Sequence, residues 1–200
     1  MPNNGLRIGV TMRVLETQEY YEPRDALAQD WSRFMSAALP EAAWLPVPNL
    51  GTNEARSYCE KWGINRLILT GGEDMGASAT RDKTEYALLT WARECGVPVL
   101  GICRGMQMIA VWAGVALKRV DGHMRKRHRL QGYFVHEVNS FHNNGLTKCP
   151  QGFEVSAKTE NGDIEAIRNT ELRWEGWMWH PEREKPFQSA DIEHLRRLFE

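Results

Sequence analysis

Apolar, strand-like runs alternate with helix-like runs over the first 115 residues, and this alternation restricts the fold more than any other feature. The expected helices have apolar residues at helical spacing and end near proline or glycine. Strands are expected at residues 6–14, 43–48, 65–70 and 97–102, and helices at residues 26–39, 52–63, 82–95 and 105–115. This order is typical of a parallel sheet covered by helices on both faces. We therefore predict an α/β fold with a mostly parallel central sheet.

The pattern changes after about residue 115, where shorter strand-like segments are separated by loops. Strands are expected at residues 115–120, 133–138, 153–159, 164–168 and 176–180, before a terminal helix at residues 190–199. The chain contains no repeat and no low-complexity linker. We therefore expect residues 1–200 to form a single domain, a length that can bury a sizeable core.

Charge and hydropathy exclude several classes of partner. The formal net charge is -1, so we expect no nucleic-acid partner. The amino terminus lacks the apolar region of a signal peptide, and the longest nearly apolar stretch, residues 108–117, is shorter than the roughly 20 residues of a membrane span. We expect a cytoplasmic protein without a membrane partner. Its four cysteines form no C-x-x-C pair, so neither disulfides nor a metal site are expected.

One cysteine lies where an expected strand runs directly into an expected helix, in the sequence Gly101-Ile102-Cys103-Arg104-Gly105. This is the cysteine counterpart of the G-x-S-x-G nucleophile elbow. The helix amino terminus and the neighbouring Arg104 would favour a thiolate. Equally, two glycines and a small residue can form a close turn around an inert core thiol, so this motif by itself leaves both interpretations open.

A thiol nucleophile needs a base and a group that orients the base. Of the six histidines, only His180 ends a strongly apolar strand and has a carboxylate two residues later, in "GWMWHPE". Pro181 should end the strand, so that Glu182 can turn back towards the imidazole. The alternative is a histidine at a strand end beside an unrelated surface glutamate.

An oxyanion site is predicted at the glycine turn "LTGGEDMG", which follows the strand at residues 65–70. In open α/β sheets, ligands bind beyond the carboxyl ends of the strands. An amide of Gly71 or Gly72, together with that of Arg104, would make a hole with two donors. An ordinary glycine turn is the competing interpretation.

The segments "LTGG", "PVLGICRGMQ", "VNSFHNNG" and "WMWHPE" occur in an order that resembles the class I glutamine amidotransferases, whose fold is a flavodoxin-like three-layer sandwich. More narrowly, they resemble the γ-glutamyl hydrolases of peptidase family C26. The resemblance implies a catalytic triad, an oxyanion hole and a glutamyl-binding pocket, without a metal or organic cofactor. The implied residues are Cys103, His180 and Glu182 for the triad, Gly71, Gly72 and Arg104 for the hole, and Gln107, Ser140, Phe141 and His142 for the pocket.

The glycine turn "GGEDMGAS" lacks the proline-rich, tyrosine-containing continuation common in that family. The segment "YYEPRDALAQDW" and the short chain are similar instead to the bacterial γ-glutamyl-CDP-amidate hydrolases of capsule phosphoramidate synthesis. The substrate would then be a small γ-glutamyl compound linked to a nucleotide. Arg24 and the basic run at residues 123–130, with Arg125 and Arg127, would bind its phosphates. The basic run could instead be a solvated loop.

Three other functions use the same fold. A hydrolase of γ-glutamyl-γ-aminobutyrate type would act on a small amide with the same triad. A glutaminase subunit would hydrolyse glutamine and pass ammonia to a synthetase, which here would have to be a separate chain. A binding protein would be expected to have lost a triad residue, and all three positions are filled in this sequence.

Overall fold

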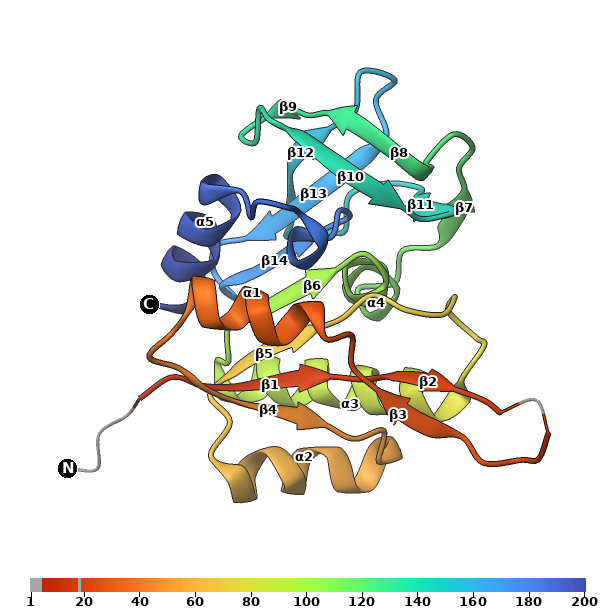
Figure 1. The fold of residues 1–200 in the computed structure, drawn as a ribbon, viewed down its shortest axis with the longest axis vertical. Helices are drawn as coiled ribbons and strands as arrows, with labels where there is room; N and C mark the ends of the chain where they lie inside the picture. Colours follow the sequence, from red (N-terminus) through yellow and green to blue (C-terminus); the bar gives the residue numbers. More distant parts are fainter. Residues whose placement is uncertain (1–4, 18) are drawn as a thin grey trace.

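The structure is a computed structural model that describes residues 5–17 and 19–200, and its centre is a sheet of eight strands in the order β4-β1-β5-β6-β14-β13-β12-β9 (Figure 1). The first five strands are parallel: β4 (Ala43–Val47), β1 (Arg7–Thr11), β5 (Arg66–Leu69), β6 (Val99–Ile102) and β14 (Trp174–Trp177). The last three continue the sheet in antiparallel pairing: β13 (Ile164–Asn169), β12 (Glu154–Lys158) and β9 (Gln131–Gly132). The predicted α/β class with a mostly parallel sheet is confirmed.

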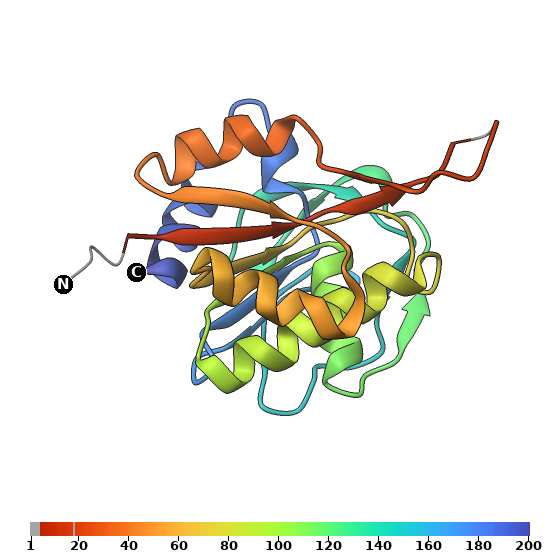
Figure 2. The ribbon, with the colours of Figure 1, turned by 90° about the horizontal axis from the view of Figure 1, so that it is seen from below.

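Helices cover both faces of the sheet, which makes three layers (Figure 2). One face packs against α1 (Asp30–Ala38) and α5 (Ser189–Phe199), and the other against α2 (Gly51–Trp62), α3 (Ala79–Cys95) and α4 (Arg104–Trp112). The strands of a sheet buried on both faces are mostly apolar, as β6 is throughout and β5 is after Arg66. Gly63 and Gly96 end α2 and α3 in the left-handed conformation, as their positions in the sequence predict.

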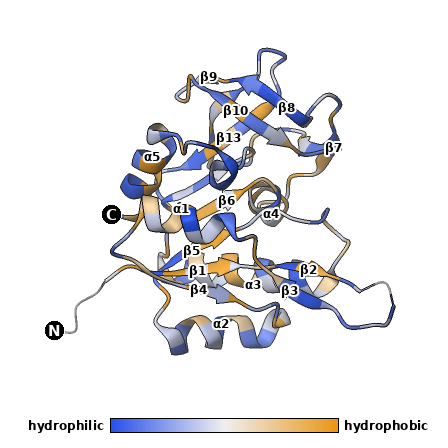
Figure 3. Ribbon diagram, in the orientation of Figure 1, coloured by the Kyte–Doolittle hydropathy of each residue, from blue (hydrophilic) through white to orange (hydrophobic). Residues whose placement is uncertain are grey.

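Three two-stranded ribbons lie outside the main sheet. They pair β2 (Arg13–Leu15) with β3 (Arg24–Ala26), β7 (Leu117–Arg119) with β11 (Asn144–Leu146), and β8 (Met124–Arg129) with β10 (Glu137–Phe141). The basic run is therefore a strand, not a loop, and Figure 3 shows it as hydrophilic. The sequence did not predict β8, because its residues are polar and mostly exposed and show no apolar alternation. Such a strand forms through its pairing with β10.

Two of the predicted boundaries that the structure corrects share one cause, the pairing of a two-stranded ribbon. The helix expected from residue 26 begins at Asp30, because residues 24–26 pair with β2. The strand expected at residues 133–138 begins at Glu137, where pairing with Arg129 starts.

The parallel strands bring three distant chain segments to one edge of the sheet. Leu69 of β5 pairs with Gly101 of β6, and Gly101 also pairs with Gly176 of β14. The segments that follow these strands contain the glycine turn, Cys103 and His180, so all three begin at the carboxyl edge. Among the described residues, no helix combines the length and apolar character that crossing a bilayer requires.

Candidate active site

Cys103 lies between β6 and α4 in a conformation that side chains rarely adopt, with φ 52° and ψ -103°. The flanking glycines make this turn sterically possible. A Cβ at Gly105 would lie 2.2 Å from the carbonyl oxygen of Leu69, and one at Gly101 would lie 2.6 Å from the backbone of Gly105. The thiol is 5% exposed and borders a cavity at the sheet edge. The local geometry is that of a nucleophile elbow.

His180 and Glu182 form a buried pair next to this turn. Pro181 begins a short 3₁₀ turn, Pro181–Arg183, which returns Glu182 to the imidazole. The His180 Nδ1 lies 2.7 Å from Glu182 Oε1, and each side chain is 2% exposed. Burial lowers the pKa of His180, but the charges of Glu182 and Cys103 outweigh it and raise this pKa to about 9. The imidazolium is therefore favoured at neutral pH, with Nε2 free to act on Cys103 or on a substrate.

Asn139 holds the backbone of His180 in place, a role that the sequence analysis missed. Its Oδ1 accepts from the His180 amide at 3.0 Å, and its Nδ2 donates to the His180 carbonyl at 2.7 Å. The same Nδ2 and the Asn139 amide both donate to Glu184 Oε1, at 2.7 and 3.1 Å. Asn139 belongs to the segment "VNSFHNNG", so its type and position were visible, but its partner lies 41 residues away.

The glycine turn after β5 faces the cysteine and the histidine. A Cβ at Gly71 would lie 2.4 Å from Cε1 of His180, so only glycine fits there. The Gly71 carbonyl accepts from Arg81 Nη2 at 3.2 Å. In a trans peptide the next amide points the opposite way, so the N–H of Gly72 points away from Arg81, and Gly72 borders the cavity.

A buried ion network beneath the turn was also missed by the sequence analysis. Arg81 on α3 donates to the Thr70 carbonyl at 2.8 Å and to Glu85 at 3.1 Å, and Glu85 also binds Arg104. Burial raises the pKa of Glu85, but the two guanidinium groups outweigh it and hold this pKa below its usual range. The Arg104 side chain is bound by Asp82 as well as by Glu85. Its charge is thus matched by carboxylates, contrary to the expectation that it serves the thiol.

The cavity at Cys103 has a volume of about 240 Å³. Its lining combines the elbow, the glycine turn and the ribbon β8–β10, and consists of Gly72, Glu73, Asp74, Cys103, Arg104, Gln107, Met124, Phe141, His142 and Asn143. The predicted pocket residues Gln107, Phe141 and His142 are therefore at the cavity. Ser140 is not among them: its hydroxyl is fully buried and donates to the His123 carbonyl at 2.6 Å.

The three arginines expected to bind phosphate do not line this cavity. Arg24, on β3, pairs with Glu22, and Arg127 pairs with Glu137 and Glu184. Arg125 is exposed on β8, next to the cavity residue Met124. A cation that the sequence analysis did not select, Arg183, lies 4.9 Å above the ring of Phe141.

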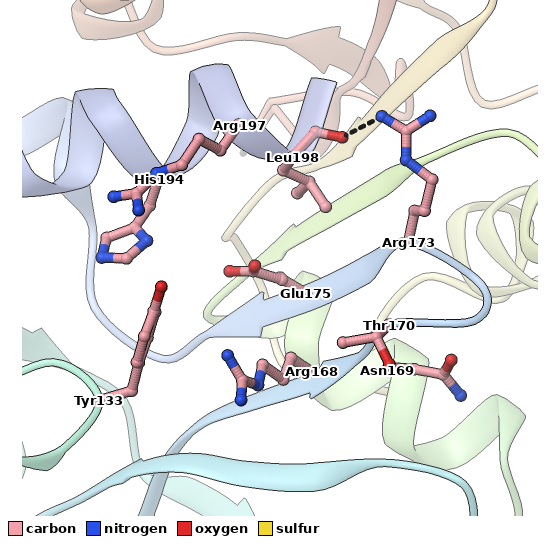
Figure 4. Close-up of a pocket in the computed structure, with 9 residues that line it drawn as sticks. All are labelled: Tyr133, Arg168, Asn169, Thr170, Arg173, Glu175, His194, Arg197 and Leu198. Atoms are coloured by element: carbon pink, nitrogen blue, oxygen red, sulfur yellow. Dashed lines mark hydrogen bonds between the residues drawn. The ribbon is translucent and has the colours of Figure 1, made fainter. Parts of the chain in front are cut away.

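A second cavity, of about 180 Å³, lies at the opposite end of β14 (Figure 4). Its lining includes Arg168, Arg173 and Arg197 together with the half-buried Glu175. The Cys103 amide bonds to Trp177 at the carboxyl end of β14, whereas Arg173 precedes its first residue. This cavity therefore does not open onto the thiol.

The sequence of this chain has counterparts among known proteins. Residues 45–195 match the family described as glutamine amidotransferase class-I. Over 194 residues the chain is 31% identical to the γ-glutamyl-CDP-amidate hydrolase of Campylobacter jejuni, covering 92% of this chain and 94% of that protein. It is 30% identical over 148 residues to the glutamine-hydrolysing GMP synthase of Blochmanniella floridana, of which it covers 27%.

Solved structures agree on the fold. A glutamine amidotransferase from Thermotoga maritima superposes with a TM-score of 0.64 at 15% identity, over 96% of this chain and 83% of that one. At this identity the likeness concerns the arrangement of the sheet and its helices.

Proposed function

Because this chain belongs to the class I glutamine amidotransferase family, we propose that it is a hydrolase of γ-glutamyl amides that uses Cys103 as its nucleophile. One observation carries the proposal: a cysteine held at positive φ at the start of a helix faces a buried histidine–glutamate pair. In this arrangement Glu182 fixes the proton on Nδ1 of His180, which leaves Nε2 for the chemistry. A buried thiol that only packed would need neither the strained turn nor the pair.

In the first half of the reaction, the Cys103 thiolate attacks the γ-carbonyl carbon and forms a C–S bond. The amides of Gly72 and Arg104 stabilise the oxyanion, and removal of one such donor typically costs about 2.7–4 kcal/mol. As the intermediate collapses, the C–N bond breaks and the His180 imidazolium gives its Nε2 proton to the leaving nitrogen. The products of this half are the free amine and a glutamyl thioester.

In the second half, water attacks the thioester and gives a proton to the now neutral His180. Collapse expels the Cys103 thiolate, which releases glutamate and restores the starting ion pair. Gln107 and Asp74 border the cavity, and their amide and carboxylate suit the carboxylate and ammonium of the glutamyl group.

For the leaving group we propose cytidine diphosphoramidate, so that the reaction serves capsule phosphoramidate synthesis. Support comes from the 31% identity to the Campylobacter jejuni enzyme over nearly the whole of both chains. Arg125 and Arg183 supply exposed or half-exposed cations near the cavity rim, where a diphosphate would emerge. Arg24 and Arg127 are held by closer carboxylates, at 2.5 Å each, whereas Arg183 has a longer contact of 3.5 Å with Glu182.

Glutamate release should be measured with glutamine, γ-glutamyl-γ-aminobutyrate and γ-glutamyl-CDP-amidate, using Cys103→Ala as the control. We expect kcat/KM to be highest for the nucleotide, and Arg125→Gln to raise KM for the nucleotide alone. Preference for a small amide would reject the nucleotide assignment but keep the hydrolase. Full activity of Cys103→Ala would reject the mechanism.

A glutaminase subunit is the second candidate, favoured by the GMP synthase relatives. The chain covers only about a quarter of these larger proteins. This candidate predicts glutamine hydrolysis that is slow in the isolated protein and rises when a synthetase partner is added. The hydrolase predicts the same rate with or without a partner.

A further inference from the structure

A cluster of histidines and carboxylates lies behind the wall of the active-site cavity. His123 precedes β8, His142 follows β10, and Glu165 lies on β13 of the main sheet. All three side chains are at least 96% buried. The proposed reaction does not use Glu165 or His123, so their burial calls for another explanation.

The three facing atoms have the spacing of ligands around one metal ion. His123 Nδ1 lies 3.2 Å from His142 Nε2, and Glu165 Oε1 lies 3.4 and 3.5 Å from these two nitrogens. Tetrahedral zinc, with bonds of about 2.0–2.1 Å, places its ligand atoms about 3.3–3.4 Å apart. The triangle is thus already close to the size that zinc requires.

The outer nitrogens of both histidines have acceptors that fix the tautomers. His142 Nδ1 lies 3.1 Å from the carbonyl oxygen of Asn144, which can only accept, so Nδ1 carries the proton. His123 Nε2 lies 3.3 Å from Asp163, which Lys118 holds at 2.8 Å. In this pattern, common for metal-binding histidines, the two inner nitrogens are the ones that face a cation. At 3.2 Å they can share a proton in a hydrogen bond, and a metal ion would take the place of that proton.

The same space contains buried polar atoms without hydrogen-bond partners among the described residues. Neither carboxylate oxygen of Glu165 accepts a hydrogen bond, although the side chain is fully buried, and Oε1 has only the longer contacts to the two histidines. Nε2 of His128 also lacks a hydrogen-bond partner, and the centroid of its ring lies 4.4 Å from that of His123. Buried groups of this kind are costly unless something binds them.

From these observations we infer that His123, His142 and Glu165 bind a zinc ion. Two imidazoles and one carboxylate are a ligand set that zinc accepts. No metal was expected from the sequence, because its four cysteines form no C-x-x-C pair. The three ligands here are separated by 19 and 23 residues and show no short spacing motif.

The ion would join the ribbon β8–β10 to the main sheet. His142 also borders the cavity, and the Asn144 carbonyl that orients it accepts from Gln107 at 2.9 Å. Zinc would therefore fix the wall on which Gln107 and Phe141 are presented. We assign it a positioning role, and His142 becomes a metal ligand instead of a group that contacts the substrate.

The test is zinc binding by the full chain after removal of metal with a chelator. We expect one equivalent of zinc to bind more tightly than about 1 μM, and a rise in melting temperature when zinc is added. Glu165→Gln should weaken binding by more than about 100-fold, and Asp163→Asn, which alters only the outer contact, by about 10–100-fold. Cobalt in place of zinc should give the visible absorption of a tetrahedral site.

Two controls separate this site from others. Cys103→Ser must keep the bound zinc, because a thiolate and His180 could themselves capture the metal. His194→Gln, at the remote second cavity, must keep it too. If Glu165→Gln does not fold, Asp163→Asn carries the test. Failure of the metal-free wild-type chain to take up zinc would overturn the inference, as would full retention of zinc by Asp163→Asn and Glu165→Gln, or its loss in Cys103→Ser.

Discussion

At the scale of single residues, Cys103 has a backbone conformation that its own side chain disfavours. Its φ of 52° is kept by the Gly101 and Gly105 contacts on either side and by the bond from its amide to the Trp177 carbonyl at 2.7 Å. Such residues cost about 1–3 kcal/mol each and are typical of functional sites. The chain therefore gives up stability at the position where we place the nucleophile.

This strain can be measured by comparing two inactive variants. Both Cys103→Ala and Cys103→Gly remove the thiol, but only glycine adopts this φ without a Cβ clash. We expect Cys103→Gly to be more stable than Cys103→Ala by about 1 kcal/mol in urea unfolding. Equal stability, or a less stable glycine variant, would show that position 103 is not strained.

His180 predicts how activity depends on pH. Its pKa of about 9 means that the imidazolium is lost as the pH rises through that value. We expect kcat/KM to fall above about pH 9. Glu182→Gln removes a charge that raises this pKa, so the basic limb should move to lower pH. If the basic limb of the pH profile lies at the same pH in both proteins, the limb does not report the titration of His180.

The raised pKa of His180 also predicts how the free energy of unfolding depends on pH. The pKa of His180 is higher in the folded chain than the ordinary value of about 6.5. The stabilisation that the charged His180 adds to the free energy of unfolding is therefore complete below about pH 6.5 and is lost as the pH rises through about 9. Unfolding midpoints in urea should fall between these pH values, and by less in His180→Gln.

At the scale of elements, α3 supports the active-site edge through charges that face inwards. Glu85 is fully buried between Arg81 and Arg104, and Arg81 holds the carbonyls of the glycine turn. Removing one partner of such a group leaves uncompensated buried charge.

We expect Glu85→Gln to lower the free energy of unfolding by about 3–5 kcal/mol. Glu94→Gln on the same helix is the matched control, since Glu94 is exposed and pairs with Arg56 at the surface. It should cost no more than about 1 kcal/mol. Chemical denaturation of both variants makes the comparison, and similar costs would mean that the buried network adds little.

At the scale of the whole molecule, aromatic side chains join the antiparallel part of the fold to the parallel sheet. Phe134, between β9 and β10, packs edge to face on Trp177 and Trp179, at 5.6 and 5.0 Å between ring centroids, and contacts His194 of α5. Trp177 is the last residue of β14, and Trp179 immediately precedes His180.

Phe134→Ala should therefore destabilise the whole fold by about 3–5 kcal/mol. Val135→Ala, at a neighbouring side chain that is 67% exposed, should change stability by less than about 0.5 kcal/mol. Thermal and urea unfolding monitored by tryptophan fluorescence can measure both. A local loss of structure near β9 with unchanged global stability would contradict the linking role.

The sequence by itself determined the alternation of strands and helices, the elbow at Cys103, and the His180–Pro181–Glu182 turn. Each of these depends on neighbours within a few residues: apolar periodicity, flanking glycines, or a proline that ends a strand. Tertiary structure alone decided which distant groups meet. Asn139 on His180, Arg81 beneath Gly71, the pairing of Arg127 with Glu184, and the cluster around Glu165 all join residues from separate elements. Their partners are chosen by sheet order and packing, which leave no spacing pattern in the chain.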